Sequence, residues 1–234
     1  MNCAELRLFG DIVARLERLG PEQNPREEIL DDLMRLMRAD FAVSRVYTPR
    51  IRDSSDLLYR NIDPETCRRY DLWYQDRDPI TTPLRSKRRP AMVEEVIASK
   101  DFYATDFYND LLRPEGMYYG VNLFIFDGQR DLGDFRLWRT KRSHEFEQRE
   151  LSVLDALHPF MKRALITSQQ TEGSLTPRER DVTRLVAKGC TDREIASLLG
   201  IGFGTVRTHL NQAMQKRNCS NRAELAALYA GRNR

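Results

Sequence analysis

Apolar residues recur at helical spacing near the start of the chain. Residues 4–19 carry them three or four positions apart, and Gly20-Pro21 ends the pattern because neither residue continues a helix well. Residues 26–38 repeat the spacing, so two amphipathic helices are expected in succession. Their apolar positions are Leu6, Phe9, Val13, Leu16 and Leu19, then Ile29, Leu30, Leu33, Met34, Leu36 and Met37.

The pattern then becomes typical of strands. Residues 41–47 and 56–62 favour two strands because their apolar residues suit a half-buried pleated surface. Asp63-Pro64 marks the start of a helix after the second strand. Much later, residues 144–170 return to helical spacing, and Pro159 is expected to kink or split that helix.

The strongest β signal is a pair of alternating segments, residues 121–126 and 133–139. Asp127-Gly128 between them favours a hairpin, because glycine adopts positive φ at little cost. Residues 127–132 are more than a two-residue turn needs, so a looser connection is expected. Helices flanking a mainly antiparallel sheet, without βαβ alternation, indicate an α+β sensor-type domain.

The last sixty or so residues contain three helix starts of the same kind. In each, a Thr or Asn can accept from a helical N–H while a Glu three residues later reaches back. The starts are Thr176-Pro177-Arg178-Glu179, Thr191-Asp192-Arg193-Glu194 and Asn221-Arg222-Ala223-Glu224. They predict four short helices, at residues 177–187, 192–199, 203–217 and 222–230. The expected shared core is Val182, Leu185, Val186, Ile195, Leu198, Leu199, Val206, Leu210, Ala213, Leu225 and Leu228.

The third of these helices has one apolar stripe, so its other side must face outward. The stripe is Val206, Leu210 and Ala213 or Met214, and the outward residues are Arg207, Thr208, Asn211, Gln212 and Gln215. Arg pairs with guanine, and Asn or Gln with adenine, so this face suits the major groove of DNA. Thr205 and His209 at its margins, and Arg193 opening the second helix, suit phosphate contacts. An ordinary solvated helix face is the alternative.

Charge favours the DNA interpretation. Residues 171–234 hold 11 Lys and Arg against 6 Asp and Glu, whereas residues 1–170 hold 27 against 29. A small basic domain after a nearly neutral one suits a polyanionic partner at the C-terminal end.

Other chemistry is sparse. The four cysteines form no C-x-x-C pair, and the three histidines form no metal-ligand spacing, so no metal or cofactor is expected. A nucleophile elbow, a phosphate loop and a paired carboxylate are all absent, and catalytic residues are not expected. No signal peptide or membrane span is recognisable, which favours a cytoplasmic protein.

The C-terminal residues resemble the LuxR/FixJ-type helix-turn-helix family over residues 174–231. The matching residues are Leu175 to Glu179, Gly189 to Ala196, Thr205 to Leu210, and Lys216. The resemblance implies base contacts from Arg207, Thr208 and Asn211 and backbone contacts from Thr205, His209 and Lys216. It also implies that Leu225, Leu228 and Tyr229 pair two subunits. Gly202, Gly204 and Arg217 depart from the family pattern, where a capping serine and a leucine are usual at the first and last of these positions.

The preceding region, best over residues 101–166, resembles the GAF/PAS-like sensory domains fused to many such regulators. Tyr70, Trp73 and Asp78-Pro79 also resemble the autoinducer-binding LuxR domains, although their order and spacing differ, which disfavours an acyl-homoserine lactone. Aromatic side chains are also common in packed cores, so each is only a candidate pocket residue. The candidates are Tyr59, Tyr70, Trp73, Asp78, Tyr103 and Phe107.

Together these features predict a GAF/PAS-like sensory domain at residues 1–168, a linker at 169–174 and a helix-turn-helix domain at 175–234. The expected function is sequence-specific regulation of transcription in response to a signal. The expected partners are double-stranded DNA, a second copy of the chain, a small-molecule effector and RNA polymerase, with no membrane. The alternative function is a protein-docking module that does not bind DNA.

Overall fold

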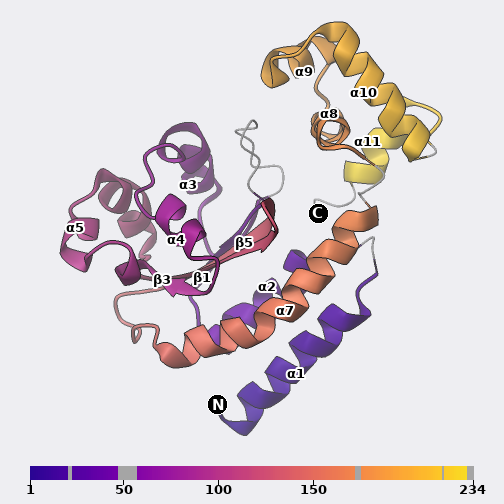
Figure 1. Cartoon of the computed structure of the whole chain (residues 1–234). Helices are drawn as coiled ribbons and strands as arrows, with labels where there is room; N and C mark the ends of the chain where they lie inside the picture. Colours follow the sequence, from indigo (N-terminus) through magenta and orange to yellow (C-terminus); the bar gives the residue numbers. More distant parts are fainter. Residues whose placement is uncertain (21–22, 47–56, 172–174, 218, 231–234) are drawn as a thin grey trace.

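The computed structural model describes residues 1–20, 23–46, 57–171, 175–217 and 219–230. A sheet flanked by helices is followed by a separate group of four helices (Figure 1). The elements are α1 (Cys3–Arg18), α2 (Pro25–Met37), β1 (Phe41–Ser44), β2 (Leu58–Arg60), α3 (Pro64–Arg69), the π-helix η1 (Tyr70–Tyr74), α4 (Thr81–Lys87), β3 (Ala91–Met92), η2 (Val93–Glu95), α5 (Ser99–Tyr103), the π-helix η3 (Phe107–Leu112), α6 (Arg113–Glu115), β4 (Tyr119–Asp127), β5 (Arg130–Arg139), α7 (Gln148–Thr171), α8 (Pro177–Ala187), α9 (Asp192–Leu199), α10 (Phe203–Lys216) and α11 (Arg222–Ala230).

The sheet has five antiparallel strands in the order β2-β1-β5-β4-β3. Successive side chains of a strand point to opposite faces, so β4 and β5 place side chains in the layers on both sides of the sheet. One face contributes the apolar residues Val121, Leu123, Phe135 and Leu137 to a core shared with α1, α2 and α7. The other face carries Phe124 and Trp138 toward α3, α4, α5 and the π-helices. The expected α+β fold with an antiparallel sheet is confirmed.

The connection between β4 and β5 is tighter than the sequence predicts. The strands pair as far as Asp127 and Arg130, which leaves a two-residue loop at Gly128-Gln129. A bulge follows Ile125, because Ile125 pairs with Gly133 and Phe126 with Asp131. Leu132 is therefore the extra residue, and its side chain is fully buried. The prediction of a looser connection was wrong because the bulge accommodates the additional residue.

Helix α7 begins later than the periodicity predicts. The Arg139 guanidinium donates to the backbone oxygens of His144 and Glu145, at 3.1 and 2.8 Å, and so holds this segment in an irregular conformation. The helix then continues through Pro159 without being split. It extends to Thr171 and so includes the first residues of the expected linker, while residues 172–174 lie outside the described residues.

The C-terminal helices begin where the capping pattern predicts. Thr176 with Glu179, and Thr191 with Glu194, form complete capping boxes at the starts of α8 and α9. At α11 the box is altered, because Asn221 accepts from the Glu224 N–H while the Glu224 carboxylate accepts from the Ser220 N–H. All four helices contribute buried apolar residues to one core.

Two residues expected in that core are exposed instead. Leu198 is 60% exposed and Leu228 is 42% exposed, because each lies on the outer side of its helix. Arg217, which stands at a usual leucine position, faces the ring of Tyr229 with its guanidinium carbon 5.6 Å from the ring centre. It therefore covers part of the core by stacking rather than reaching fully into solvent.

A buried carboxylate fixes α10 against α8. Glu179 is 2% exposed, and its Oε2 accepts from the Lys216 Nζ at 2.6 Å and from the Thr176 N–H at 2.7 Å. Burial raises the pKa of Glu179, but these hydrogen bonds outweigh that effect and hold it below its ordinary value. The C-terminal end of α10 is thereby tied to the N-terminal end of α8.

No helix within the described ranges combines the length and the hydropathy that crossing a membrane requires.

The contact between Gly120 and Trp138 gives a stability prediction. A Cβ at Gly120 would lie 2.7 Å from the Trp138 ring and 2.8 Å from Val93, so Gly120→Ala should destabilise the N-terminal domain by about 1–3 kcal/mol. Gly10→Ala is the control, because a Cβ there meets nothing within 4 Å and should stabilise α1 by up to ~1 kcal/mol. Urea unfolding measures both. Equal stability of Gly120→Ala and wild type would contradict the close contact.

The Glu179–Lys216 pair gives a pH prediction. Because the pKa of Glu179 is lowered in the folded state, its stabilisation is present above the unfolded pKa of about 4.3 and is lost as the pH falls through the folded value. Glu179→Gln keeps a capping side chain but removes the charge, so it should lower stability at pH 7 by about 1.5–3 kcal/mol and flatten the acid dependence. Hydrogen exchange of the α10 amides at pH 7 and urea unfolding from pH 7 to 3 are the measurements. An unchanged acid profile would show that the pair contributes nothing.

Candidate DNA interface and effector cavity

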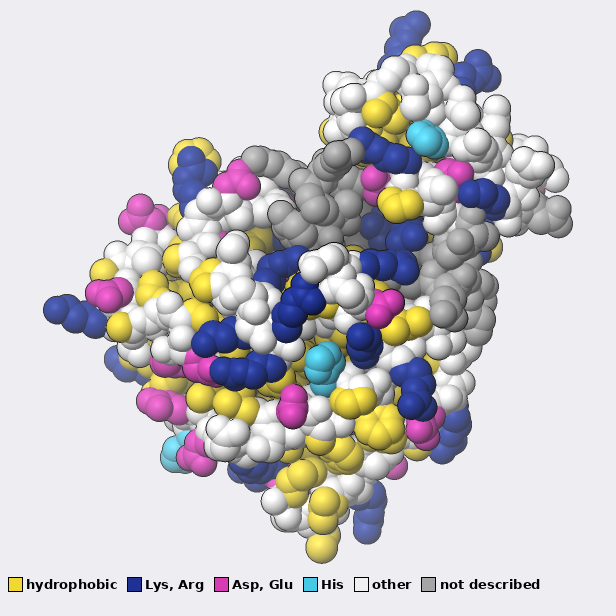
Figure 2. Space-filling view, viewed as in Figure 1, with side chains coloured by type: hydrophobic (Ala, Val, Ile, Leu, Met, Phe, Trp, Pro, Cys, Tyr) yellow, Lys and Arg dark blue, Asp and Glu magenta, His cyan; other side chains and the backbone are white. Residues whose placement is uncertain are grey.

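Helix α10 presents a polar face because its apolar face is already occupied. Val206 and Ala213 are fully buried and Leu210 is 6% exposed, all within the core of the four-helix domain. The side opposite this stripe is exposed as predicted, with Arg207, Thr208, Asn211, Gln212 and Gln215. In the space-filling view, Lys and Arg side chains lie at the outer end of this domain (Figure 2).

The individual residues of this face differ in their freedom to bind DNA. The Arg207 guanidinium lies 6.0 Å from the ring of Phe203, one turn earlier, and that ring is itself 47% exposed. The Thr208 hydroxyl donates to the Gly204 oxygen at 3.1 Å, which leaves its oxygen able to accept another hydrogen bond. Thr205 is exposed, whereas His209 is half-buried and its Nδ1 has no hydrogen-bond partner within the described residues.

The other expected phosphate contacts lie at helix ends. Arg193 is exposed in the first turn of α9. Asp192 beside it is engaged by Arg222 of α11, which also donates to the Cys190 oxygen. Lys216 is partly exposed but already paired with Glu179, so any phosphate that it met would share its ammonium group with that carboxylate.

The three residues expected to pair two subunits are not equally available. Leu225 is fully buried and Tyr229 is 7% exposed, both within the domain's own core. Leu228 alone of the three is exposed on α11.

A second candidate site lies on the face of the sheet opposite α7. It is a cavity of about 70 Å³, enclosed by β1, β4 and β5 on one side and by the segments from α3 to η3 on the other. Its apolar walls include Phe107, Leu111 and Trp138. At its polar end lie Arg45, Tyr70, Asp71, Asp78, Thr81, Asn122 and Arg136.

The guanidinium of Arg136 contacts three other side chains at this polar end. It donates to Asp134 Oδ2 through Nε at 2.9 Å and Nη2 at 2.8 Å. Its Nη1 donates to the Thr81 hydroxyl at 3.0 Å and the Tyr70 hydroxyl at 3.3 Å. Burial opposes the charge, but Asp134, Tyr70 and Asp78 together raise the pKa of Arg136 above its ordinary value, so the side chain stays protonated.

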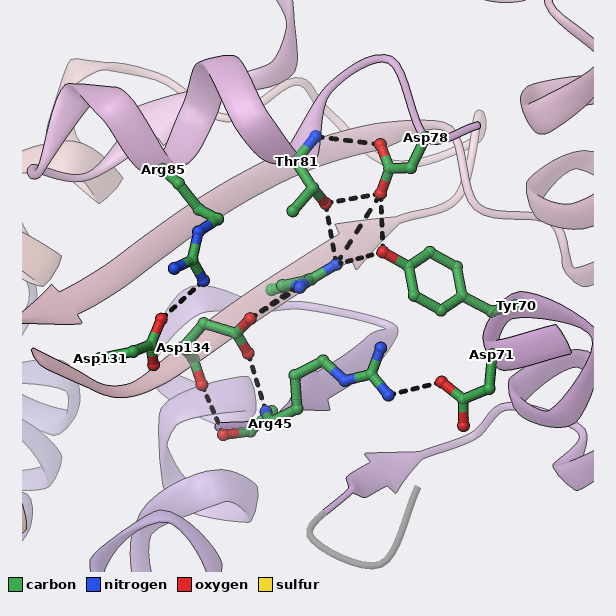
Figure 3. A network of polar contacts seen from close by, with 10 residues as sticks. Arg45, Tyr70, Asp71, Asp78, Thr81, Arg85, Asp131 and Asp134 are labelled. Carbon is green, nitrogen blue, oxygen red and sulfur yellow. Dashed lines mark hydrogen bonds and ion pairs between the residues drawn. The ribbon is translucent and has the colours of Figure 1, made fainter. Parts of the chain in front are cut away.

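A second guanidinium extends the same network. Arg45 follows β1, and its Nη2 donates to Asp71 Oδ1 at 2.5 Å, with each side chain 8% exposed. The backbone N–H of Arg45 donates to Asp134 Oδ1 at 2.8 Å, which joins the two parts of the network (Figure 3). A chain of hydrogen bonds thus runs from η1 across β1 to β5.

Three of the six candidate pocket residues line the cavity, namely Tyr70, Asp78 and Phe107. The other three lie elsewhere. Trp73 is 57% exposed, with the Arg77 guanidinium 3.9 Å from its ring centre. Tyr103 stacks on Tyr118 in a separate surface hollow, 4.7 Å between ring centres. Tyr59 lies on β2 and packs against the core without lining the cavity. These three residues do not line this cavity, because the direction of a side chain depends on its helix or strand, not on its aromatic character.

Sequence reasoning missed Arg45, Asp71, Asn122 and Arg136. A usable signal was present in β4 and β5, where Asn122, Asp134 and Arg136 share one face of the sheet with the apolar Phe124 and Trp138. Polar residues at inward positions of a buried strand are unusual and often mark a site.

The cavity offers no obvious covalent chemistry. Cys67 lines it, but burial raises the pKa of this thiol to about 11, so it is not a ready nucleophile. No group of three His, Cys, Asp or Glu side chains in the described ranges could hold a metal ion.

Comparisons with known proteins find relatives for both parts of the chain. A family model described as bacterial regulatory proteins of the luxR family matches residues 173–229. The Monoamine regulon transcriptional regulator of Klebsiella aerogenes is 25% identical over 199 residues, which is 85% of this chain and 87% of that protein.

Two solved structures resemble the N-terminal domain in fold. The VqsR LBD domain from Pseudomonas aeruginosa superposes with a TM-score of 0.52 at 18% identity, covering 72% of this chain and 98% of that one. A GAF domain of a phosphoenolpyruvate-protein phosphotransferase from Coxiella burnetii gives 0.51 at 14% identity, covering 73% and 97%. Residues 173–229 therefore match the luxR family of bacterial regulatory proteins, and the N-terminal domain has a fold similar to that of GAF domains.

Proposed function

We propose that the chain is a transcription regulator that reads a specific DNA site through α10. Occupancy of the N-terminal cavity changes how the protein binds that DNA. The observation that carries the DNA half is the exposed row of Arg207, Asn211 and Gln212 over a filled apolar core. A guanidinium and carboxamides in this setting can form the bidentate pairs that distinguish guanine and adenine in the major groove.

The proposed roles of the remaining residues follow from their positions. Thr208 lies beside Arg207 on the exposed face and contacts base edges. Thr205, His209, Lys216 and Arg193 lie at the margins of that face or at helix ends, where phosphate contacts set the register of a protein on DNA. These contacts add affinity without selecting a sequence.

We extend the proposal to a homodimer that binds half-sites about one helical turn apart. Leu228 is the exposed apolar residue of α11 that supports a contact between subunits, while Leu225 and Tyr229 position it from the core. Contact with RNA polymerase and a cytoplasmic location follow from the role, because a bacterial DNA-bound regulator acts on transcription there.

Helix α7 is the proposed connection between the cavity and the DNA-binding domain. It packs on β4 and β5 through residues such as Leu154 and Leu157, and the same strands form one wall of the cavity. It then continues to Thr171, next to the start of the DNA-binding domain (Figure 1). A ligand that shifted these strands would move the helix that leads to α8.

Replacement of Arg207 tests the recognition face. Arg207→Ala should weaken binding to a selected operator by about 1–3 kcal/mol and relax base preference at one position, because a bidentate guanine contact is lost. Operators are obtained by selection from random duplexes, and affinities are measured by fluorescence anisotropy. Arg68→Ala is the control, since it removes an exposed arginine of α3 and should leave operator binding unchanged.

A salt titration separates this proposal from a docking module that does not bind DNA. With about 6–10 phosphate contacts, affinity for duplex DNA should fall by roughly 10³–10⁵ between 50 and 200 mM salt. Arg193→Ala should reduce the slope of log affinity against log salt concentration by about one, because one phosphate contact is lost, and leave base preference intact. If wild type shows no DNA affinity at low salt, the DNA-binding proposal fails.

A further inference from the structure

The buried network beside the cavity contains more carboxylates than guanidinium groups. Asp71, Asp78 and Asp134 face Arg45 and Arg136, and each of these side chains is at most 10% exposed. The adjoining Arg85–Asp131 ion pair, at 2.6 Å, adds one charge of each sign. The described part of the network therefore carries one formal negative charge in excess. An uncompensated buried charge is costly, so this arrangement favours the arrival of a cation.

The hydrogen bonds locate the excess on one atom. Asp78 Oδ1 accepts from the N–H groups of Ile80 and Thr81, and its Oδ2 accepts from the hydroxyls of Tyr70 and Thr81. Both oxygens of Asp134 are likewise occupied, by Arg45 and Arg136.

Asp71 differs from these two carboxylates. Its Oδ1 accepts a hydrogen bond from Arg45 Nη2, but its Oδ2 is buried and has no hydrogen-bond partner within the described residues. Of the six carboxylate oxygens in the group, this is the one that lacks a donor.

A second unpaired atom lies on the same cavity. The Nδ2 of Asn122 is buried and has no acceptor among the residues that the structure describes. Asn122 is directly opposite Arg136 in the register of β4 and β5. Asp71 and Asn122 both line the cavity, from the helical side and from the sheet side. A ligand that satisfies both must therefore carry one donor and one acceptor.

The walls and the volume limit the ligand further. Phe107 and Trp138 offer aromatic faces that can attract a cation as well as an apolar group. The cavity volume of about 70 Å³ is several times the roughly 10–15 Å³ that one water requires, which suits a small organic molecule.

We propose that the effector is a small organic ammonium ion bearing a hydroxyl or carbonyl oxygen, an inference that rests on the proposed function. Its ammonium group donates to Asp71 Oδ2, and its oxygen accepts from Asn122 Nδ2. A carboxylate or phosphate ligand would add a second excess negative charge at the same place. The cavity therefore selects against anions.

Three probes that share a ring and a hydroxyl test the charge preference on the full-length protein. They are 4-hydroxybenzylamine, 4-methylphenol and 4-hydroxybenzoate, which are cationic, neutral and anionic. In isothermal titration calorimetry the amine should bind at least tenfold more tightly than 4-methylphenol, and 4-hydroxybenzoate should not bind. A smaller pair, 3-aminopropan-1-ol and butan-1-ol, tests the same difference without a ring. Preference for a neutral or anionic member, or no binding of either amine, overturns the proposal.

Asp71→Asn should lower the affinity for the bound amine at least tenfold and leave that for its neutral analogue within about threefold. Asp110→Asn is the matched control, because Asp110 accepts from the Tyr74 hydroxyl and does not line the cavity. Equal losses for amine and neutral analogue would overturn the assignment of Asp71.

If Asp71→Asn does not fold, Asn122→Asp replaces it as the test. The second carboxylate should strengthen binding of the amine relative to binding of its neutral analogue. The absence of such a gain would also count against the proposal.

Operator binding with and without the amine separates this inference from the function on which it rests. If the neutral probe binds as tightly as the amine or more tightly, and changes operator affinity, the sensory function stands and the ammonium assignment is wrong. If the amine binds as expected but operator affinity stays the same, the ligand assignment stands and the coupling through α7 is wrong.

Discussion

The opposite orientation of consecutive residues in β5 is the constraint that joins the two layers of the N-terminal domain. Leu137 belongs to the apolar core in which α7 packs, whereas its neighbours Arg136 and Trp138 line the cavity. A displacement of this strand by a bound molecule cannot leave the α7 side untouched, because close-packed interiors transmit small shifts. The cavity and α7 therefore both contact the same strand, β5.

The polar end of the cavity is not what stability alone would select. Well-packed apolar side chains often stabilise a protein as much as, or more than, a buried ion network does. The network instead holds Arg45, Tyr70 and Arg136 in defined positions, since each hydrogen-bonds to a group from a different segment of the chain. Such mutual fixation is what a binding site requires of the side chains that meet its ligand.

The two domains differ in how much of their site could be predicted from sequence. On α10, burial of Val206 and Leu210 forces Arg207 and Asn211 outward, and one helical period relates all four residues. Tyr70 and Asp78 of the cavity were also among the candidates, because Tyr70 and Asp78-Pro79 resemble residues of the autoinducer-binding LuxR domains. Arg136 was not identified, since the Tyr70 and Thr81 hydroxyls that it meets belong to residues more than fifty positions earlier in the chain.

The sequence by itself determined the helices of the DNA-binding domain and the outward face of α10, because capping and periodicity act over a few neighbouring residues. It also determined that an antiparallel sheet with flanking helices precedes them. Only the tertiary structure decided that Trp73 and Leu228 face solvent, and that Asp71 meets Arg45 beside a cavity. Those outcomes depend on which distant segments pack together, and that choice is made by the whole core rather than by any local pattern.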